Sequence, residues 1–231
     1  MREALRANRP LDKVLIAKGT SGPRIQEVVD LCRERGIPVR FESRDALDRV
    51  SKGTPHQGII AFGAAHDYAD LNAVLDEAQM LVLLDGVEDP HNLGAIIRTA
   101  HAAGADALIV PERRAAPLTE TVDKAAAGAL EYLPVVRVTN ITQTIERLKQ
   151  QKFWIYGLDE RGTELYDHVD YATPTAIVLG GEGKGLHQNV QKHCDALVRI
   201  PMAGAVSSLN VSVAAGVVLF EWRRRTKSRK R

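Results

Sequence analysis

The stretch from Leu81 to Thr99, LVLLDGVEDPHNLGAIIRT, decides the fold class of this chain. Its first residues, Leu81 to Asp85, form a nearly continuous apolar run, which is typical of a strand buried on both faces. The residues from Leu93 to Ala103 then show the apolar spacing of a helix. A buried strand that leads directly into a helix predicts an α/β domain with a mostly parallel sheet.

The same alternation continues toward the C-terminus. The expected strands lie at 108–110, 135–138, 153–157, 176–179 and 197–200, and the expected helices at 119–130, 141–151 and 208–224. Ligands of such folds gather at the carboxyl ends of the strands, so the loops that follow the strands are the candidate site.

The residues before this domain form a smaller α/β unit. Strands are expected at 14–17, 37–41 and 57–62, with a helix at 24–35 that Gly36 ends. We therefore expect an N-terminal domain at 1–62, a linker at 63–77 and the main domain at 78–231.

Composition narrows the class of protein. The 231 residues are 45% hydrophobic, and no apolar run approaches the roughly 20 residues that span a bilayer. We expect a cytoplasmic protein with no membrane partner.

Cys32 and Cys194 lie far apart in the sequence and indicate neither a disulfide framework nor a zinc site. The net charge of +2 is too small to argue for nucleic acid, but the basic run 223–231, RRRTKSRKR, is either an RNA contact or a solvated tail.

A glycine-rich turn, LGGEGKGL at 179–186, follows the strand expected at 176–179. It is not a Walker loop, because Gly185 follows Lys184 where that motif needs Ser or Thr. It is not a dinucleotide fingerprint either, because Leu186 takes the place of the last glycine. The carboxylate of Glu182 disfavours phosphate and suits a cation or an arginine.

Two further segments contain candidate site residues, each of which also has an explanation that involves no function. Asn92 is suited to cap the helix after the first strand, and Arg98 on that helix is suited to a solvated face. The segment 200–213, IPMAGAVSSLNVSV, leads into the last expected helix, where Ser208 and Asn210 either cap it or face a site.

Together the three loops resemble the motifs of the SpoU branch of the SPOUT RNA methyltransferases. Asn92 and Arg98 match the first motif, the glycine turn with Glu182 matches the second, and 200–214 matches the third. The resemblance implies an α/β knot fold with a deep trefoil knot, and a homodimer whose active sites lie near the subunit interface.

Upstream, the unit containing Gln57-Gly58-Ile59 is similar to the L7Ae/L30e-like substrate-binding domain of 23S ribosomal RNA guanosine-2′-O-methyltransferases. Those relatives usually begin with a segment that this chain lacks before Arg2, so a short element is either missing or trimmed.

The resemblance also implies S-adenosylmethionine as methyl donor, with no metal. The implied donor contacts are Gly180, Gly181, Ile200, Pro201, Met202 and Leu209. The implied catalytic group consists of Asn92, Arg98, Glu182, Ser208 and Asn210. In the family the arginine that matches Arg98 is proposed to assist proton loss from the ribose hydroxyl, although a guanidinium is not an ordinary base. The alternative role is to orient the hydroxyl and the adjacent phosphate and to stabilise the developing charge, with Glu182 anchoring Arg98.

Of four alternatives, the first two stay open, and the sequence argues against the other two. A tRNA ribose is an alternative target, and a non-catalytic RNA-binding protein for ribosome assembly is an alternative function. Base methylation at carbon-5 needs a cysteine nucleophile, and neither cysteine lies in the three loops. A nicotinamide- or ATP-dependent enzyme is disfavoured by the failed glycine fingerprints.

Overall fold

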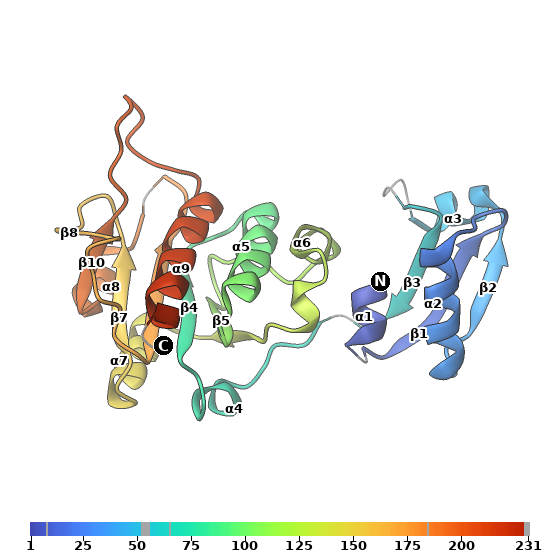
Figure 1. Cartoon of the computed structure of the whole chain (residues 1–231), viewed down its shortest axis with the longest axis horizontal. Coiled ribbons are helices and arrows are strands. Elements are labelled where there is room, and N and C mark those ends of the chain that lie inside the picture. Colours follow the sequence, from blue (N-terminus) through green and yellow to red (C-terminus); the bar gives the residue numbers. More distant parts are fainter. Residues whose placement is uncertain (8, 52–55, 65, 184, 229–231) are drawn as a thin grey trace. The chain divides into compact units, whose positions relative to one another are not determined.

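The computed structural model describes residues 1–7, 9–51, 56–64, 66–183 and 185–228 (Figure 1). The chain divides into two compact units, Met1–His66 and Asp67–Arg231, which are described separately. No helix in the described part of the chain is both long and apolar enough to cross a membrane.

The smaller unit is built on a three-stranded sheet. Strand β1 (Leu11–Ala17) lies in the centre, parallel to β2 (Val39–Glu42) and antiparallel to β3 (Ile59–Gly63). The expected helix is α2 (Pro23–Glu34), which buries Val28 and Cys32. Two short helices, α1 (Arg2–Arg6) and α3 (Arg44–Ser51), complete the unit and escaped the sequence analysis.

The larger unit contains the expected parallel sheet, so the predicted α/β class is confirmed; the knot stays a prediction. The strand order is β6-β5-β4-β9-β7-β10-β8, and all its neighbours run parallel. The strands are β4 (Met80–Asp85), β5 (Ala107–Pro111), β6 (Val135–Val138), β7 (Trp154–Leu158), β8 (Glu164–Leu165), β9 (Thr175–Gly180) and β10 (Ala196–Arg199). All six residues of β4 are buried, as its apolar run predicts.

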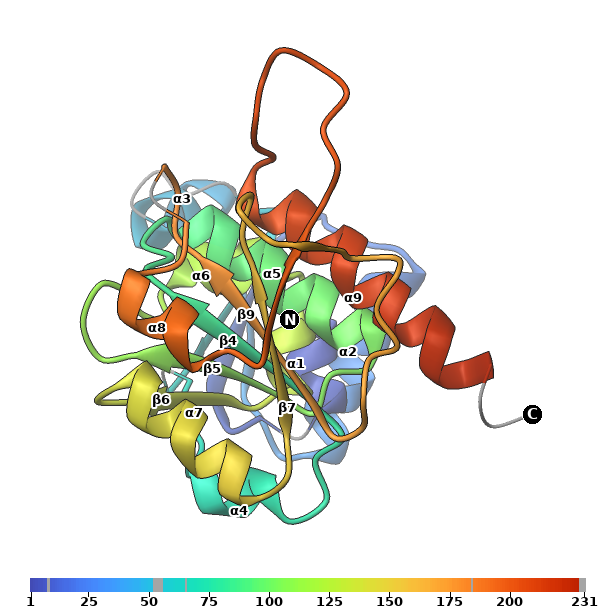
Figure 2. The same cartoon turned by 90° about the vertical axis from the view of Figure 1, so that its left-hand side faces the viewer.

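Helices cover both faces of this sheet (Figure 2). One face packs on α5 (Pro90–Ala103), α6 (Glu120–Ala126) and α9 (Val211–Ser228), and a short 3-10 turn (Ala129–Glu131) follows α6. The other face packs on α4 (Leu71–Leu75), α7 (Ile141–Gln150) and α8 (Gln188–His193). The side chains from the two faces of the strands therefore fill two separate cores.

Two expected segments, the linker and the last helix, differ from the structure. The linker expected at 63–77 contains α4, whose N-cap Asp70 accepts hydrogen bonds from the backbone of Asn72 and Ala73, and most of that segment belongs to the larger unit. The last helix begins at Val211 rather than at 208, because residues 201–210 form an exposed loop. Figure 2 shows this loop projecting from the larger unit between β10 and α9.

Candidate active site

The sheet order brings the three predicted loops to one edge. Strand β9 lies between β4 and β7, and β10 lies beside β7, so the carboxyl ends of these four strands are neighbours. Asp85 at the end of β4 pairs with Gly180 at the end of β9, and the Gly181 amide donates to the Asp85 carbonyl at 2.9 Å. The loops after β4 and β9 are therefore joined by backbone contacts.

The glycine turn is too tight for side chains at its first two positions. A Cβ at Gly180 would lie 2.1 Å from the carbonyl carbon of Gly185, and a Cβ at Gly181 would lie 2.0 Å from the Gly86 carbonyl oxygen. Neither neighbour can give way, because both are backbone atoms. The two glycines thus permit a close turn whose backbone borders a cavity.

One residue from each loop takes part in a hydrogen-bond chain. The side chain of Asn92, which is buried, donates through Nδ2 to Oε1 of Glu182. The Asn92 Oδ1 accepts from Nδ2 of Asn210 at 3.0 Å. These contacts span 90 and 118 positions of the sequence and join all three loops at a single buried amide.

The capping explanation for Asn92 is wrong, and for Asn210 it is right. Asp89 caps α5 by accepting from the His91 amide at 2.9 Å, with Pro90 in the first turn. Asn210 caps α9, since its Oδ1 accepts from the Ser212 amide at 2.9 Å. Asn210 uses its oxygen for the cap and its nitrogen for Asn92, so the cap also fixes the hydrogen-bond chain.

A cavity of about 620 Å³ opens between the glycine turn and the projecting loop. It is lined by residues 158–161, 179–183, 185, 200, 202, 207–211 and 214. The predicted residues among them are Gly180, Gly181, Glu182, Ile200, Met202, Ser208, Leu209 and Asn210. Asn92, Arg98 and Pro201 are not part of this lining. The volume is in the range of pockets that hold small-molecule ligands.

The cavity wall contains a buried carboxylate that the sequence analysis missed. Asp159, 5% exposed, follows β7 and accepts from Nε and Nη2 of Arg161 at 2.7 and 2.9 Å. The Arg161 hydrogen bonds hold the pKa of Asp159 below its usual value, and Gln191 donates to the same carboxylate at 3.1 Å. Periodicity could not reveal that this pair lies in the cavity wall, because only the sheet order places the end of β7 beside β9.

The charge of the cavity is mostly negative. Asp159, Glu160 and Glu182 are the acidic residues of the described lining, and Arg161 is the basic one. Because Arg161 is already paired with Asp159, the remaining carboxylates give the cavity a preference for a cation over a phosphate.

Arg98 lies apart from these groups. It is exposed on α5, and it forms no hydrogen bond or ion pair with any residue in the described part of the chain. The pair expected between Arg98 and Glu182 is therefore replaced by the contact between Asn92 and Glu182. The guanidinium of Arg98 faces solvent, and no carboxylate in the described part of the chain neutralises its positive charge.

Neither cysteine is suited to nucleophilic catalysis. Cys32 is buried in the smaller unit, where burial raises the pKa of its thiol. Burial also raises the pKa of Cys194 to about 12, and its Sγ contacts the Val190 carbonyl at 3.4 Å. A thiolate is the reactive form, so these environments argue against a cysteine-dependent reaction.

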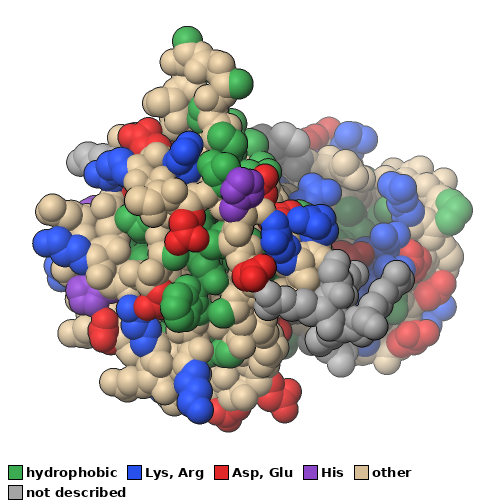
Figure 3. Space-filling view, turned by 60° about the vertical axis from the view of Figure 1, so that its left-hand side comes forward, with side chains coloured by type: hydrophobic (Ala, Val, Ile, Leu, Met, Phe, Trp, Pro, Cys, Tyr) green, Lys and Arg blue, Asp and Glu red, His purple; other side chains and the backbone are tan. Residues whose placement is uncertain are grey.

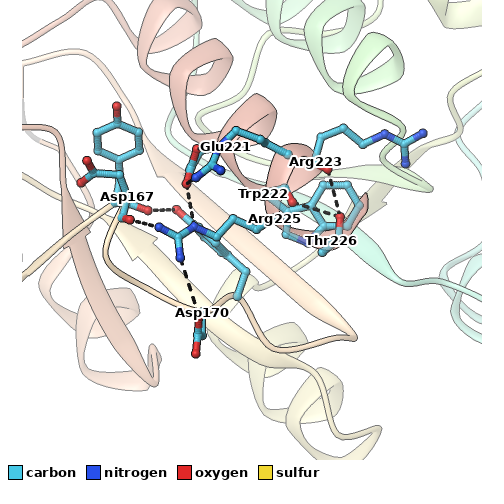
Figure 4. Close-up of polar contacts among 10 residues, drawn as sticks. Asp167, Asp170, Glu221, Trp222, Arg223, Arg225 and Thr226 are labelled. Atoms are coloured by element: carbon cyan, nitrogen blue, oxygen red, sulfur yellow. Dashed lines mark hydrogen bonds and ion pairs between the residues drawn. The ribbon is translucent and has the colours of Figure 1, made fainter. Parts of the chain in front are cut away.

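Part of the basic C-terminal run is held inside the larger unit (Figure 4). Arg225 donates to Glu221 at 2.7 Å and to the Asp167 carbonyl, and its Nη1 lies 3.7 Å from Asp170. Arg224 also donates to Glu221, at 2.6 and 2.8 Å. These two arginines are neutralised within the chain, and residues 229–231 of the run lie outside the described residues.

Comparison with known families gives two matches that together cover most of the chain. Residues 79–220 match the SpoU rRNA Methylase family, and residues 1–69 match a family described as RNA 2′-O ribose methyltransferase substrate binding.

The similar proteins and solved structures are also named as methyltransferases. YacO of Bacillus subtilis, whose name assigns it to the TrmH family of tRNA/rRNA methyltransferases, is 42% identical over 225 residues, covering 95% of this chain and 90% of its own. The SpoU methyltransferase AviRb of Streptomyces viridochromogenes, crystallised with AdoMet, has a TM-score of 0.81 at 28% identity, covering 98% of this chain and 87% of its own. An AdoMet-bound rRNA methyltransferase of Sinorhizobium meliloti has a TM-score of 0.80 at 27% identity, covering 96% and 83%.

Proposed function

The chain belongs to the SpoU rRNA methylase family of S-adenosylmethionine-dependent RNA 2′-O-methyltransferases, and on that basis we propose that its target is the ribose of a guanosine in 23S ribosomal RNA. The substrate-binding match over residues 1–69 supports an RNA substrate. The rRNA named for the structural neighbour from Sinorhizobium meliloti supports the choice of ribosomal RNA. A tRNA ribose is the alternative target, because the name of YacO includes both RNAs.

The observation that carries the proposal is the hydrogen-bond chain through Asn92. It joins helix α5, which carries the unpaired Arg98, to a glycine turn with a carboxylate and to a loop that lines a ligand-sized cavity. Methyl transfer to a hydroxyl needs a donor pocket and a group that stabilises an oxyanion. The cavity supports the first, and Arg98, on the same helix as Asn92, is proposed as the second.

The residues of the cavity fit the methyl donor. The side-chain-free turn at Gly180 and Gly181 permits backbone contact with an adenine ring, and Ile200, Met202 and Leu209 offer apolar surface. The donor supplies a methyl group activated on a positively charged sulfur, and the negative charge of Glu182 suits that cation. Pro201 lies next to two lining residues and is proposed to shape the loop.

The remaining groups serve the RNA hydroxyl. The 2′-hydroxyl must lose its proton as its oxygen bonds to the methyl carbon. Arg98, which has no partner in the described chain, is proposed to bind that oxygen and its neighbouring phosphate. The hydrogen bond between Asn92 and Asn210 is proposed to hold the first and third loops together during the reaction, and Ser208 lines the cavity from the third loop.

We also propose that the protein acts as a homodimer. Large apolar side chains are exposed on the projecting loop and on α9, namely Met202, Val206, Leu209, Val213 and Phe220. Figure 3 shows apolar side chains along the projecting loop. A second copy that covers this surface would bury them next to the cavity, and light scattering of V213E/F220E against the native protein tests this. A native protein that stays monomeric at micromolar concentration contradicts it.

Ribose-methylation mapping tests the target. We expect that deletion of the gene removes one 2′-O-methylguanosine from 23S rRNA and that the native gene restores it, whereas an R98A copy does not. Loss of a tRNA ribose methyl group instead would establish the alternative target. Unchanged methylation of both RNAs would refute the proposal.

A further inference from the structure

Near the glycine turn but outside the lining of the donor cavity, the ends of three adjacent strands build a second polar cluster. Asp85 ends β4, Arg114 lies in the loop after β5, and His187 precedes α8 after β9. Strands β5, β4 and β9 are consecutive neighbours in the sheet, so the three residues come from one edge. None of them lines the donor cavity.

The cluster is anchored by a buried carboxylate. Asp85 is 4% exposed, and its Oδ2 accepts from the His187 amide at 2.8 Å. The same oxygen lies 2.9 Å from Nδ1 of His187, without the alignment of a good hydrogen bond. The ring also rests near Gly86, where a Cβ would lie 3.5 Å from Cε1 of His187. The imidazole is therefore fixed from two directions.

His187 in turn holds an exposed arginine. Nη1 of Arg114 lies 2.7 Å from Nε2 of His187. A guanidinium can only donate hydrogen bonds, so Nε2 accepts and the ring proton resides on Nδ1, beside the Asp85 carboxylate. Arg114 has a left-handed backbone with φ of 59°, which is uncommon for a residue with a side chain.

Arg114 differs from the paired arginines because its partner is an imidazole rather than a carboxylate. Arg161 is paired with Asp159, Arg224 with Glu221, and Arg225 with Glu221 and Asp170, so carboxylates offset each of these charges. Arg114 is held by an imidazole instead, and among the described residues no carboxylate pairs with it. It is thus oriented by a hydrogen bond while its positive charge and its other N–H donors stay available to an anion.

We propose that Arg114 binds a backbone phosphate of the RNA next to the target nucleotide, and that His187 and Asp85 are positioning residues for it. The inference rests on the RNA substrate of the family but not on which RNA it is. Phosphate contacts position a nucleic acid without reading its sequence. This contact would therefore fix the register of the RNA strand over the glycine turn while the target ribose reaches the cavity.

The test measures RNA affinity at several salt concentrations, by fluorescence anisotropy with a labelled transcript of a 23S rRNA domain and with a tRNA transcript. For R114A we expect about a tenfold weaker Kd at low salt and a salt slope smaller by about 1, the signature of one lost phosphate contact. The matched control is R113A, which removes the same charge from the neighbouring exposed residue and is expected to lose less than about threefold. Equal losses in both variants would show general charge attraction and overturn the proposal.

Two substitutions test the positioning role. Gln at position 187 keeps an acceptor where Nε2 lies, so H187Q should stay within about threefold of the native RNA affinity, whereas H187L should approach the affinity of R114A. AdoMet affinity measured by calorimetry and the Tm should be unchanged in R114A. A loss of AdoMet binding or of folding in R114A, or equal behaviour of H187Q and H187L, would contradict the role. These binding measurements do not depend on methyl transfer, so a wrong target RNA would not be mistaken for a failure of this contact.

Discussion

Replacing Asn92 by Asp tests the hydrogen-bond chain with almost no change of shape. In N92D, Oδ1 still accepts from Asn210, but the Nδ2 donor that faces Glu182 becomes a carboxylate oxygen. The charge-assisted hydrogen bond, about 1.5–3 kcal/mol, is lost. Two carboxylates that relax to about 4 Å repel by up to about 4 kcal/mol at an effective dielectric constant near 20.

Because Glu182 is partly solvated, we expect a net cost of about 2–4 kcal/mol. For a domain of this size that lowers the Tm by about 5–10 °C at pH 8, as measured by differential scanning calorimetry. In folded N92D the two carboxylates repel only while both are ionised, so the folded variant takes up a proton more readily than the unfolded chain does. The destabilisation is therefore present at high pH and fades as the pH falls toward about 5.

The double variant N92D/E182Q supplies the control. A glutamine at position 182 donates to the new aspartate and removes the repulsion, so the Tm should return most of the way to the native value. If N92D is as stable as the native protein at pH 8, or if E182Q does not rescue it, the contact between Asn92 and Glu182 is not formed and the reasoning fails.

The other predictions concern catalysis, the donor cavity and stability. R98A should lower methyl transfer at least about a hundredfold while AdoMet affinity by calorimetry changes less than a few fold; lost AdoMet binding would make Arg98 structural. G180A places a Cβ against the Gly185 backbone and should abolish AdoMet binding, whereas G204A, whose Cβ meets no atom within 4 Å, should bind normally; equal binding by both would place the donor elsewhere. Hydrogen bonds from Arg224 lower the pKa of Glu221 to about 2, so its stabilisation is present above pH 4.5 and is lost as the pH falls toward 2; a constant Tm difference between native protein and E221Q over that range would contradict this.

The strands of the larger unit could be predicted where their residues form buried apolar runs; the two-residue strand β8, which has no such run, was missed. Residues 80–85 and 175–180 are almost wholly enclosed, and the expected runs lie within one or two residues of the observed strands. The short helices α1, α3, α4 and α8 were missed, since five to eight residues give too few turns for an apolar period to show.

The sequence could predict which loops meet at the candidate site, but not the contacts between them. Glycine at positions 180 and 181 and the amides of Asn92 and Asn210 were identified by motif, and the structure gives each a physical reason. Asp159 and Arg161 are only two positions apart, but their place in the cavity wall could not be found, because it depends on β7 lying beside β9. The partner of Glu182 was wrongly expected to be Arg98 for the same reason: which long side chain reaches a carboxylate is a matter of three-dimensional packing.

The central claim is that the loops joined through Asn92 deliver a methyl group to a ribose 2′-oxygen. The most direct measurement incubates the purified protein with AdoMet labelled in its methyl group and unmodified 23S rRNA, followed by complete alkaline hydrolysis. A 2′-O-methyl group blocks cleavage of the adjacent phosphodiester, so the account predicts that the label appears in alkali-resistant dinucleotides that begin with guanosine. Label in mononucleotides would mean that a base is methylated and would contradict the account.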